Sequence, residues 1–103
     1  MSNPISEEFR IIAKKWVEAD AAANMLEESK SAVLAKMISA QGDIPVNRAE
    51  TRVKSSDAWS DYIKSMVDAR EKASMLKVQL EYIRMRFSEW QSFEANRRAE
   101  MKL

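Results

Sequence analysis

Apolar residues recur along this chain in alternating steps of three and four positions, in two long series. The first series runs from Ile5 to Ala40 and is interrupted only by Lys30, and the second runs from Trp59 to Trp90. This spacing is the 3.5-residue repeat of a coiled coil, so each series predicts a long helix with one apolar seam. The seam positions are Ile5, Phe9, Ile12, Trp16, Ala19, Ala23, Leu26, Val33, Met37 and Ala40, then Trp59, Tyr62, Met66, Ala69, Ala73, Leu76, Leu80, Ile83, Phe87 and Trp90.

The residues that break helices lie at one place near the middle of the chain. Gly42 is the only glycine, and Pro45 is the only proline apart from Pro4. Glycine readily adopts the left-handed conformation that ends a helix, and proline is tolerated at the start of the next one. The two seams therefore belong to two helices joined by a turn, which makes them antiparallel neighbours.

Capping residues set the expected bounds of three helices. The first begins at a cap, either Asn3 or Ser6, and ends near Gln41. Pro45 opens a short second helix, and Asp57 begins a third that continues almost to the terminus. The sequence thus predicts an all-α fold, an antiparallel helical hairpin of two long helices with a short connecting helix. A chain of this length forms a single domain over residues 1–103.

Side-chain size predicts how the two long helices align. Pairing residues whose numbers add up to 99 places large side chains against small ones along the middle of the hairpin. Ala19 then meets Leu80, and Lys30 meets Ala69, from where its ammonium group reaches towards Asp68. The same alignment leaves residues 95–103 projecting beyond the first helix.

Two helices cannot cover all the apolar positions. Further apolar side chains flank both seams, and a two-helix hairpin has no enclosed core in which to bury them. Self-association is one solution, with a dimer that completes a four-helix bundle as the favoured form. The alternative is that this surface binds a different protein partner, and periodicity leaves both open. The candidates for this surface are Val17, Leu34, Ile38, Ile63, Val78, Tyr82, Met85 and Phe93.

The chain lacks the residue types on which most catalytic sites depend. Without cysteine and histidine, the chain lacks a thiol nucleophile, the usual general base and the commonest transition-metal ligand. No glycine-rich phosphate loop, nucleophile–base pair or paired-carboxylate cleft stands out. We therefore expect no catalytic residue, no metal site, no cofactor and no enzyme activity. No apolar run is long enough to cross a bilayer and no leader begins the chain, which predicts a cytoplasmic protein without membrane contact.

Arginines and aromatic residues alternate towards the C-terminal end. The chain has 17 basic and 16 acidic groups, and its net charge of +1 gives little support to a dedicated polyanion binder. A local patch of Arg84, Arg86, Arg97 and Arg98 could still hold a nucleic-acid backbone while aromatic rings stack on bases. The seam favours the opposing interpretation, in which the rings of Phe87 and Trp90 form core and Arg84 and Arg86 are ordinary solvated or salt-bridged side chains.

Several segments resemble small helical proteins encoded by tailed phages and prophages. These segments cover nearly the whole chain and are Leu26–Lys30, Pro45–Glu50, Ala69–Ala73, Arg84–Ser92 and Arg97–Met101. Proteins of this group are encoded in early replication and recombination modules, beside single-strand annealing proteins or nucleases. The resemblance implies a phage accessory protein that acts by binding, in the cytosol of a bacterial host.

Two functions are consistent with these observations. The first is a non-enzymatic interaction protein that binds a phage or host factor of DNA metabolism or antiphage defence. The second is a nucleic-acid-binding accessory factor of phage recombination or replication that uses the four arginines. The second function predicts binding that weakens steeply with salt, because each neutralised phosphate releases counterions.

Overall fold

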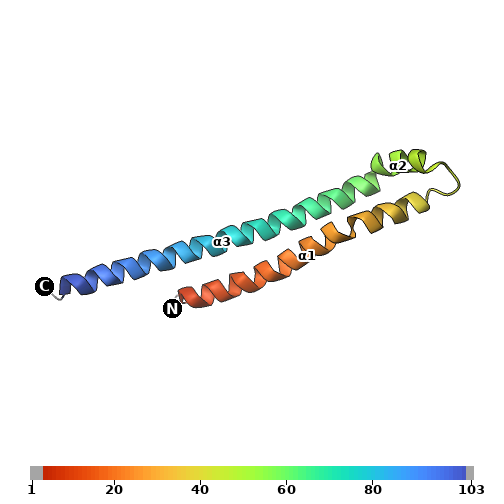
Figure 1. Ribbon diagram of the computed structural model, residues 1–103. Coiled ribbons are helices and arrows are strands. Elements are labelled where there is room, and N and C mark those ends of the chain that lie inside the picture. The colour runs from red at the N-terminus through yellow and green to blue at the C-terminus, as the bar shows by residue number, and fades with distance from the viewer. Residues whose placement is uncertain (1–3, 102–103) are drawn as a thin grey trace.

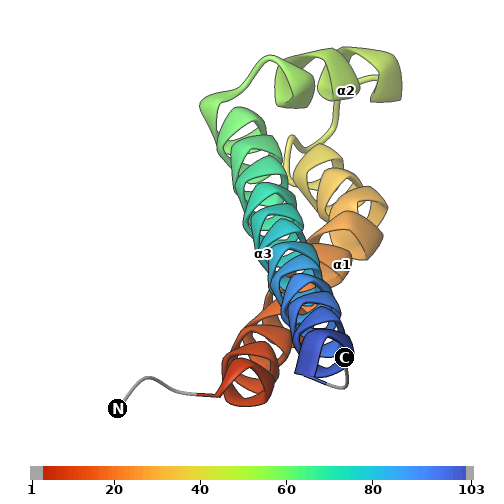
Figure 2. The same ribbon diagram turned by 90° about the vertical axis from the view of Figure 1, so that its left-hand side faces the viewer.

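The computed structural model describes residues 4–101, which form three helices: α1 (Ile5–Ser39), α2 (Val46–Lys54) and α3 (Asp57–Met101). The long helices α1 and α3 run antiparallel side by side (Figure 1). The short helix α2 lies across the end at which they are joined, which we call the closed end (Figure 2). The molecule measures 84 × 22 × 18 Å along its principal axes. The all-α hairpin of two long helices with a short connecting helix is therefore confirmed.

Gly42 follows the end of α1 in the conformation that the sequence predicts. Its φ is +86°, the only positive φ among residues 4–101, and its amide donates to the carbonyl of Ser39 at 3.2 Å. A Cβ atom at this position would meet nothing within 4 Å. Glycine is therefore favoured by its backbone conformation and not by lack of space. Pro45, with a φ of −54°, stands directly before α2.

The two long helices begin differently. The Ser56 hydroxyl caps α3 by accepting a hydrogen bond from the amide of Trp59 at 3.2 Å. α1 has no side-chain cap, and the carbonyl of Pro4 accepts two amides of the first turn instead. The expected cap by Ser6 is wrong, because Ser6 already lies inside α1. The alternative cap, Asn3, lies outside the described residues.

The predicted seam forms the contact between α1 and α3. Ala23 is fully buried and Ala73 is 1% exposed, so small side chains from both helices form the centre of the contact. At the closed end, α2 contributes two more buried side chains to the core. The buried seam residues are Ala19, Ala23, Trp59, Ala73, Leu80 and Ile83, and those of α2 are Ala49 and Val53.

The alignment of α1 against α3 differs from the expected one by roughly a heptad. The guanidinium carbon of Arg84 lies 5.4 Å from the ring centre of Phe9, and Arg86 pairs with Glu8 at 3.1 Å. The numbers of these contacting residues add up to 93 and 94, whereas size matching predicted 99. The predicted alignment is therefore wrong.

Close packing of small residues gives a physical reason for this difference. Ala19 borders the same groove as Ala69 and Leu76, whereas the predicted alignment placed it against Leu80. When small side chains from both helices lie at one level, the backbones approach closely and gain dispersion contacts. Matching large residues with small ones considered side-chain volume alone and left this gain out.

Lys30 does not take the position that the predicted alignment gave it. Its side chain is exposed, and Asp68, the expected partner of its ammonium group, pairs with Lys64 one turn earlier on α3 at 3.2 Å. Lys30 therefore interrupts the apolar series without lying in the core.

Candidate functional site at the open end of the hairpin

The end of the hairpin opposite α2, which we call the open end, carries an apolar groove between α1 and α3. Ile5 and Phe9 of α1 line it together with Ile83 and Phe87 of α3. The groove has a volume of about 420 Å³. Its walls are seam residues, so it is a part of the helix–helix contact that the two long helices leave unfilled.

An exposed aromatic pair continues this groove along α3. The rings of Phe87 and Trp90 are stacked, with centres 6.0 Å apart and planes 27° apart. The two side chains are 42% and 51% exposed, so the expectation that they form core is wrong. The reason is the alignment: Ile5 at the start of α1 shares a groove with Phe87 and Ser88, and α3 continues beyond that level (Figure 1). The projecting part of α3 therefore begins near Ser88 and not at residue 95.

Arg84 and Arg86 hold the two helices together near the open end. Arg84 lies over the ring of Phe9, and Arg86 pairs with Glu8 and lies 5.9 Å from the ring centre of Tyr82. Both guanidinium groups thus already have a partner within the hairpin. This arrangement agrees with the interpretation of these arginines as paired flanks of the seam.

Arg97 and Arg98 lie on the projecting part of α3. Arg97 pairs with Glu94 at 3.2 Å, and Arg98 is exposed in the last turn. At 100° per residue, Arg86 and Arg97 point to one side of α3 while Arg84 and Arg98 point to another. The structure therefore does not bring the four predicted arginines together into one patch.

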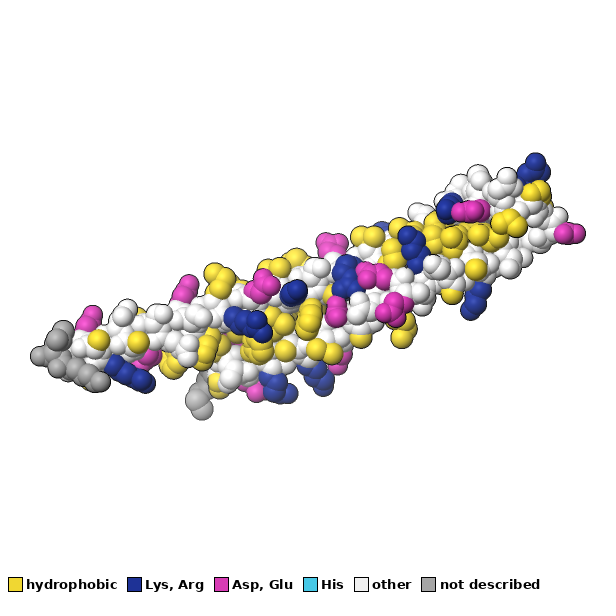
Figure 3. Space-filling model, in the orientation of Figure 1, with side chains coloured by type: hydrophobic (Ala, Val, Ile, Leu, Met, Phe, Trp, Pro, Cys, Tyr) yellow, Lys and Arg dark blue, Asp and Glu magenta, His cyan; other side chains and the backbone are white. Residues whose placement is uncertain are grey.

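The eight apolar candidates divide into two groups. Five of them are more than half exposed, whereas Leu34, Ile38 and Ile63 are partly buried and lie towards the closed end, where α2 packs. Hydrophobic side chains also appear at intervals along the edge of α3 that faces away from α1 (Figure 3). The exposed candidates are Val17 (58%), Val78 (57%), Tyr82 (61%), Met85 (61%) and Phe93 (65%).

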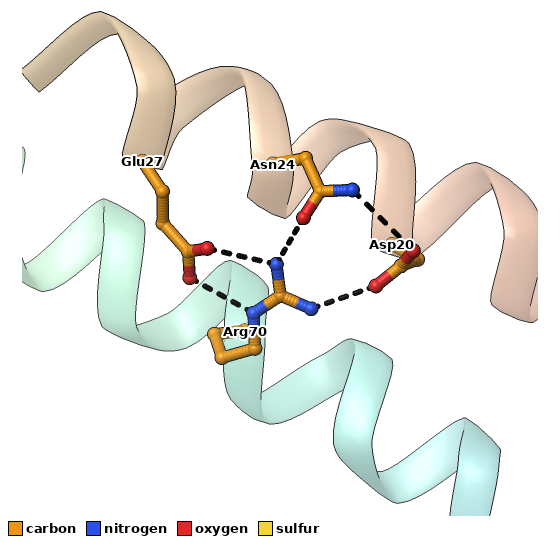
Figure 4. Close-up of polar contacts among 4 residues, drawn as sticks. All are labelled: Asp20, Asn24, Glu27 and Arg70. Carbon is orange, nitrogen blue, oxygen red and sulfur yellow. Dashed lines mark hydrogen bonds and ion pairs between the residues drawn. The ribbon is translucent and has the colours of Figure 1, made fainter.

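A polar cluster that the sequence analysis missed connects the middle of the two helices (Figure 4). Arg70 of α3 donates to both carboxylate oxygens of Glu27 at 2.8 and 2.9 Å and to Asp20 at 2.7 Å. It also donates to the side-chain oxygen of Asn24, whose amide donates to Asp20. The signal in the sequence was the spacing of Asp20, Asn24 and Glu27 by four and three, which places them on one side of α1.

This cluster is electrostatic support for the helix alignment. The hydrogen bonds from Arg70 lower the pKa of the Glu27 carboxyl below its ordinary value, more than its partial desolvation raises it. The same partners raise the pKa of Arg70, which stays charged in any case. A planar guanidinium that binds three side chains of α1 fixes the position of α1 along α3. Every hydrogen bond of the Arg70 side chain in this cluster is made to α1.

Two further kinds of feature are absent from the described residues. Residues 4–101 contain no group of three or more acidic side chains placed to hold a metal ion. No helix within the same range is long and apolar enough to cross a membrane. No protein-family model matches this chain, and no curated protein or solved structure is detectably similar to it. The most prominent candidate surfaces of this extended hairpin are therefore its exposed apolar ones.

Proposed function

We propose that this protein is a non-enzymatic phage accessory protein that binds a protein partner of DNA metabolism or antiphage defence in the cytosol of a bacterial host. The observation that carries the proposal is the exposed stack of Phe87 and Trp90, which extends the apolar seam of α3 beyond its contact with α1. The phage setting rests on the sequence segments that resemble small phage proteins.

An amphipathic helix of the partner fits the chemistry of the open end. Such helices bind by placing apolar side chains, three or four residues apart, into an apolar groove. Ile83, Phe87 and Trp90 have this spacing on α3, so a partner helix laid along them extends the coiled-coil packing that α1 begins. Exposed aromatic rings gain a large contact area when a partner covers them.

Self-association into a four-helix bundle is the second part of the proposal. Within residues 4–101, twelve large hydrophobic side chains are exposed, whereas only eight hydrophobic residues are buried. Most helical stability in proteins comes from packing an apolar face against other elements, and two helices give each other little such packing. A second copy supplies the missing surface.

Nucleic-acid binding is the alternative function, and the observed contacts give it less support. Arg86 and Arg97 already pair with carboxylates, and Arg84 lies over an aromatic ring. The carboxylates of Glu8 and Glu94, beside Arg86 and Arg97, would repel a bound phosphate. A dispersed set of paired arginines on a chain of net charge +1 makes a weak polyanion site.

A photo-crosslinking amino acid in place of Trp90 tests the partner-binding proposal in bacterial cells. We expect an adduct with a different protein when the probe is at position 90, because this side chain extends the groove. The matched control carries the same probe in place of Met25, which is 70% exposed on α1. Adducts of equal yield at both positions, or adducts with a second copy alone, would contradict partner binding at the open end.

Fluorescence anisotropy with labelled single- and double-stranded DNA tests the alternative. The proposal predicts no binding at low salt. Binding that weakens with salt and is lost when Arg97 and Arg98 are both replaced by glutamate would favour the nucleic-acid function instead.

A further inference from the structure

The outward face of α3 carries a second apolar series, distinct from the seam and from the open end. Its members, which we call the outer stripe, are Val67, Met75, Val78, Tyr82, Met85 and Phe93, and each is between 54% and 65% exposed. At 100° per residue they fall within an arc of about 80°. The centre of this arc lies opposite the seam that contacts α1, and Figure 3 shows hydrophobic side chains along this edge of α3. No other described part of the chain covers the outer stripe.

The outer stripe is symmetric about Leu80. Val78 and Tyr82 lie two residues from this point on either side, Met75 and Met85 lie five, and Val67 and Phe93 lie thirteen. An antiparallel contact between two copies of one helix must be self-complementary about a two-fold axis, so each residue meets its mirror position on the other copy. The outer stripe satisfies this condition at all three pairs of positions.

The surface area of the chain fits an extensive contact between copies. Its accessible surface is 8181 Å², whereas a compact protein of the same mass exposes about 5,900 Å². The excess is larger than the roughly 800 Å² that each partner buries in an interface of standard size. Along the helix axis the outer stripe extends for about 39 Å, long enough to bury such an area.

We infer that two copies of this chain pack α3 against α3 in an antiparallel arrangement, with the outer stripe as the interface. The two-fold axis crosses the interface at the level of Leu80, whose own side chain is buried on the opposite side of α3. This inference rests on the proposed self-association and specifies its geometry. Because the outer stripe is opposite the seam, the four helices lie nearly in a row, α1–α3–α3–α1, and this arrangement replaces the four-helix bundle as the form of the dimer. The open end of each copy stays free for a partner.

Two symmetry-related levels of this interface are electrostatically unfavourable, which gives a way to locate the two-fold axis. Glu71 and Glu89 each lie nine residues from Leu80 on the same face, so each meets the other across the interface. Like charges that face each other oppose association. Two such contacts occur in the dimer, because the two-fold axis repeats every contact.

The first experiment measures mass by sedimentation equilibrium over a range of concentrations. We expect a dimer for the full chain, and Val78→Glu weakens it roughly 100-fold because a charge is buried at the centre of the interface. The control, Val17→Glu, introduces the same charge at an equally exposed valine of α1 and leaves the dimer intact. A dimer that resists Val78→Glu but dissociates with Val17→Glu overturns the inferred interface while leaving self-association in place. A monomer at all concentrations overturns both.

Charge exchange tests the position of the two-fold axis. Glu71→Lys alone and Glu89→Lys alone each turn two repulsive contacts into attractive ones, and each tightens the dimer roughly fivefold. The double variant faces lysine with lysine and returns affinity towards that of the unmodified chain. Additive effects in the double variant would contradict the alignment at Leu80. Helical circular dichroism of every variant separates a change of association from a loss of folding.

Distances between spin labels test the antiparallel direction. The chain has no cysteine, so a single cysteine at Ser65 or at Ser88 places one label on each copy. The inferred axis separates the two labels along the helices by about 45 Å for Ser65 and about 24 Å for Ser88. Equal distances at both positions would show a parallel contact and overturn the inference.

Discussion

Each end of the hairpin carries a stacked aromatic pair on α3, and the two pairs differ in how far their rings are buried. At the closed end, Trp59 and Tyr62 are stacked with ring centres 5.7 Å apart, and at the open end Phe87 and Trp90 are stacked at 6.0 Å. Both pairs are spaced by three residues on the seam of α3, yet Trp59 is 8% exposed and Trp90 is 51% exposed. Seam periodicity thus identifies the apolar side of the helix. Whether that side is buried depends on which other parts of the chain pack against it.

At the closed end the partner is within the chain. The Tyr62 hydroxyl donates to the carbonyl of Leu26 in α1, and α2 adds Ala49 and Val53 to the buried core. At the open end α3 continues past α1, Phe87 lines a groove, and Trp90 stacks on Phe87. The aromatic pair at the closed end therefore contributes to folding, whereas the pair at the open end is left exposed.

The largest expected effect distinguishes the two tryptophans directly. Trp59→Ala removes a buried ring and should lower the free energy of unfolding by about 3–5 kcal/mol. Trp90→Ala removes an exposed ring and should lower it by less than about 1 kcal/mol. Chemical denaturation at one protein concentration measures both. Equal losses for the two variants would show that the ends do not differ.

A larger side chain at the middle of the seam tests whether the helices pack there as tightly as in the core at the closed end. Ala23→Leu forces a large side chain into a fully buried position and should cost about 1–3 kcal/mol of stability. The control is Ala22→Leu, at the neighbouring exposed alanine, which should have little effect. A stable Ala23→Leu variant would mean that the two helices do not approach closely at this level.

The turn at the closed end gives a smaller effect. Gly42→Ala places a Cβ atom in open space but at a φ of +86°, so we expect a loss of about 1–2 kcal/mol from backbone strain alone. Gly42→Asn should cost less, because asparagine tolerates the left-handed region better. Equal losses for alanine and asparagine would argue against a left-handed residue at this position.

The smallest expected effect concerns the Arg70 cluster that aligns the helices. Because the pKa of Glu27 is lowered in the folded state, its contribution to stability is present above the ordinary value of 4.5 and is lost as pH falls through the lowered pKa. We therefore expect the thermal midpoint to decrease slightly below pH 4.5. Arg70→Gln should remove this part of the pH dependence, as thermal melts at pH 7 and in the acidic range would reveal. An identical pH profile for Arg70→Gln would show that the cluster contributes nothing.

The sequence predicted the architecture because its signals are local. The heptad spacing, Gly42 and Pro45 each act over a few residues, and the structure has three helices in residues 4–101 close to the expected bounds. The alignment of the helices was predicted wrongly, because it depends on cross-helix contacts. The close approach of alanines around Ala23 and the contacts of Arg70 outweighed the size matching on which the prediction relied.

The candidate site was predicted in part for the same reason. Tyr82, Val78 and Met85 were recognised as surplus apolar residues from the spacing alone, and they are exposed. Phe87 and Trp90 were assigned to the core, because their exposure follows from the level at which α1 begins beside α3. That level is set by the alignment and cannot be derived from periodicity.

We propose that the aromatic seam at the open end serves binding and not folding. The most direct test recovers proteins bound to the full chain from cells, with Trp90→Ser and the control Met25→Ser in parallel, and records a thermal melt of each variant. We expect that Trp90→Ser loses a bound protein that Met25→Ser retains, with a melting temperature close to that of the unmodified chain. Recovery of the same proteins by both variants, or a large drop in melting temperature for Trp90→Ser, would contradict it.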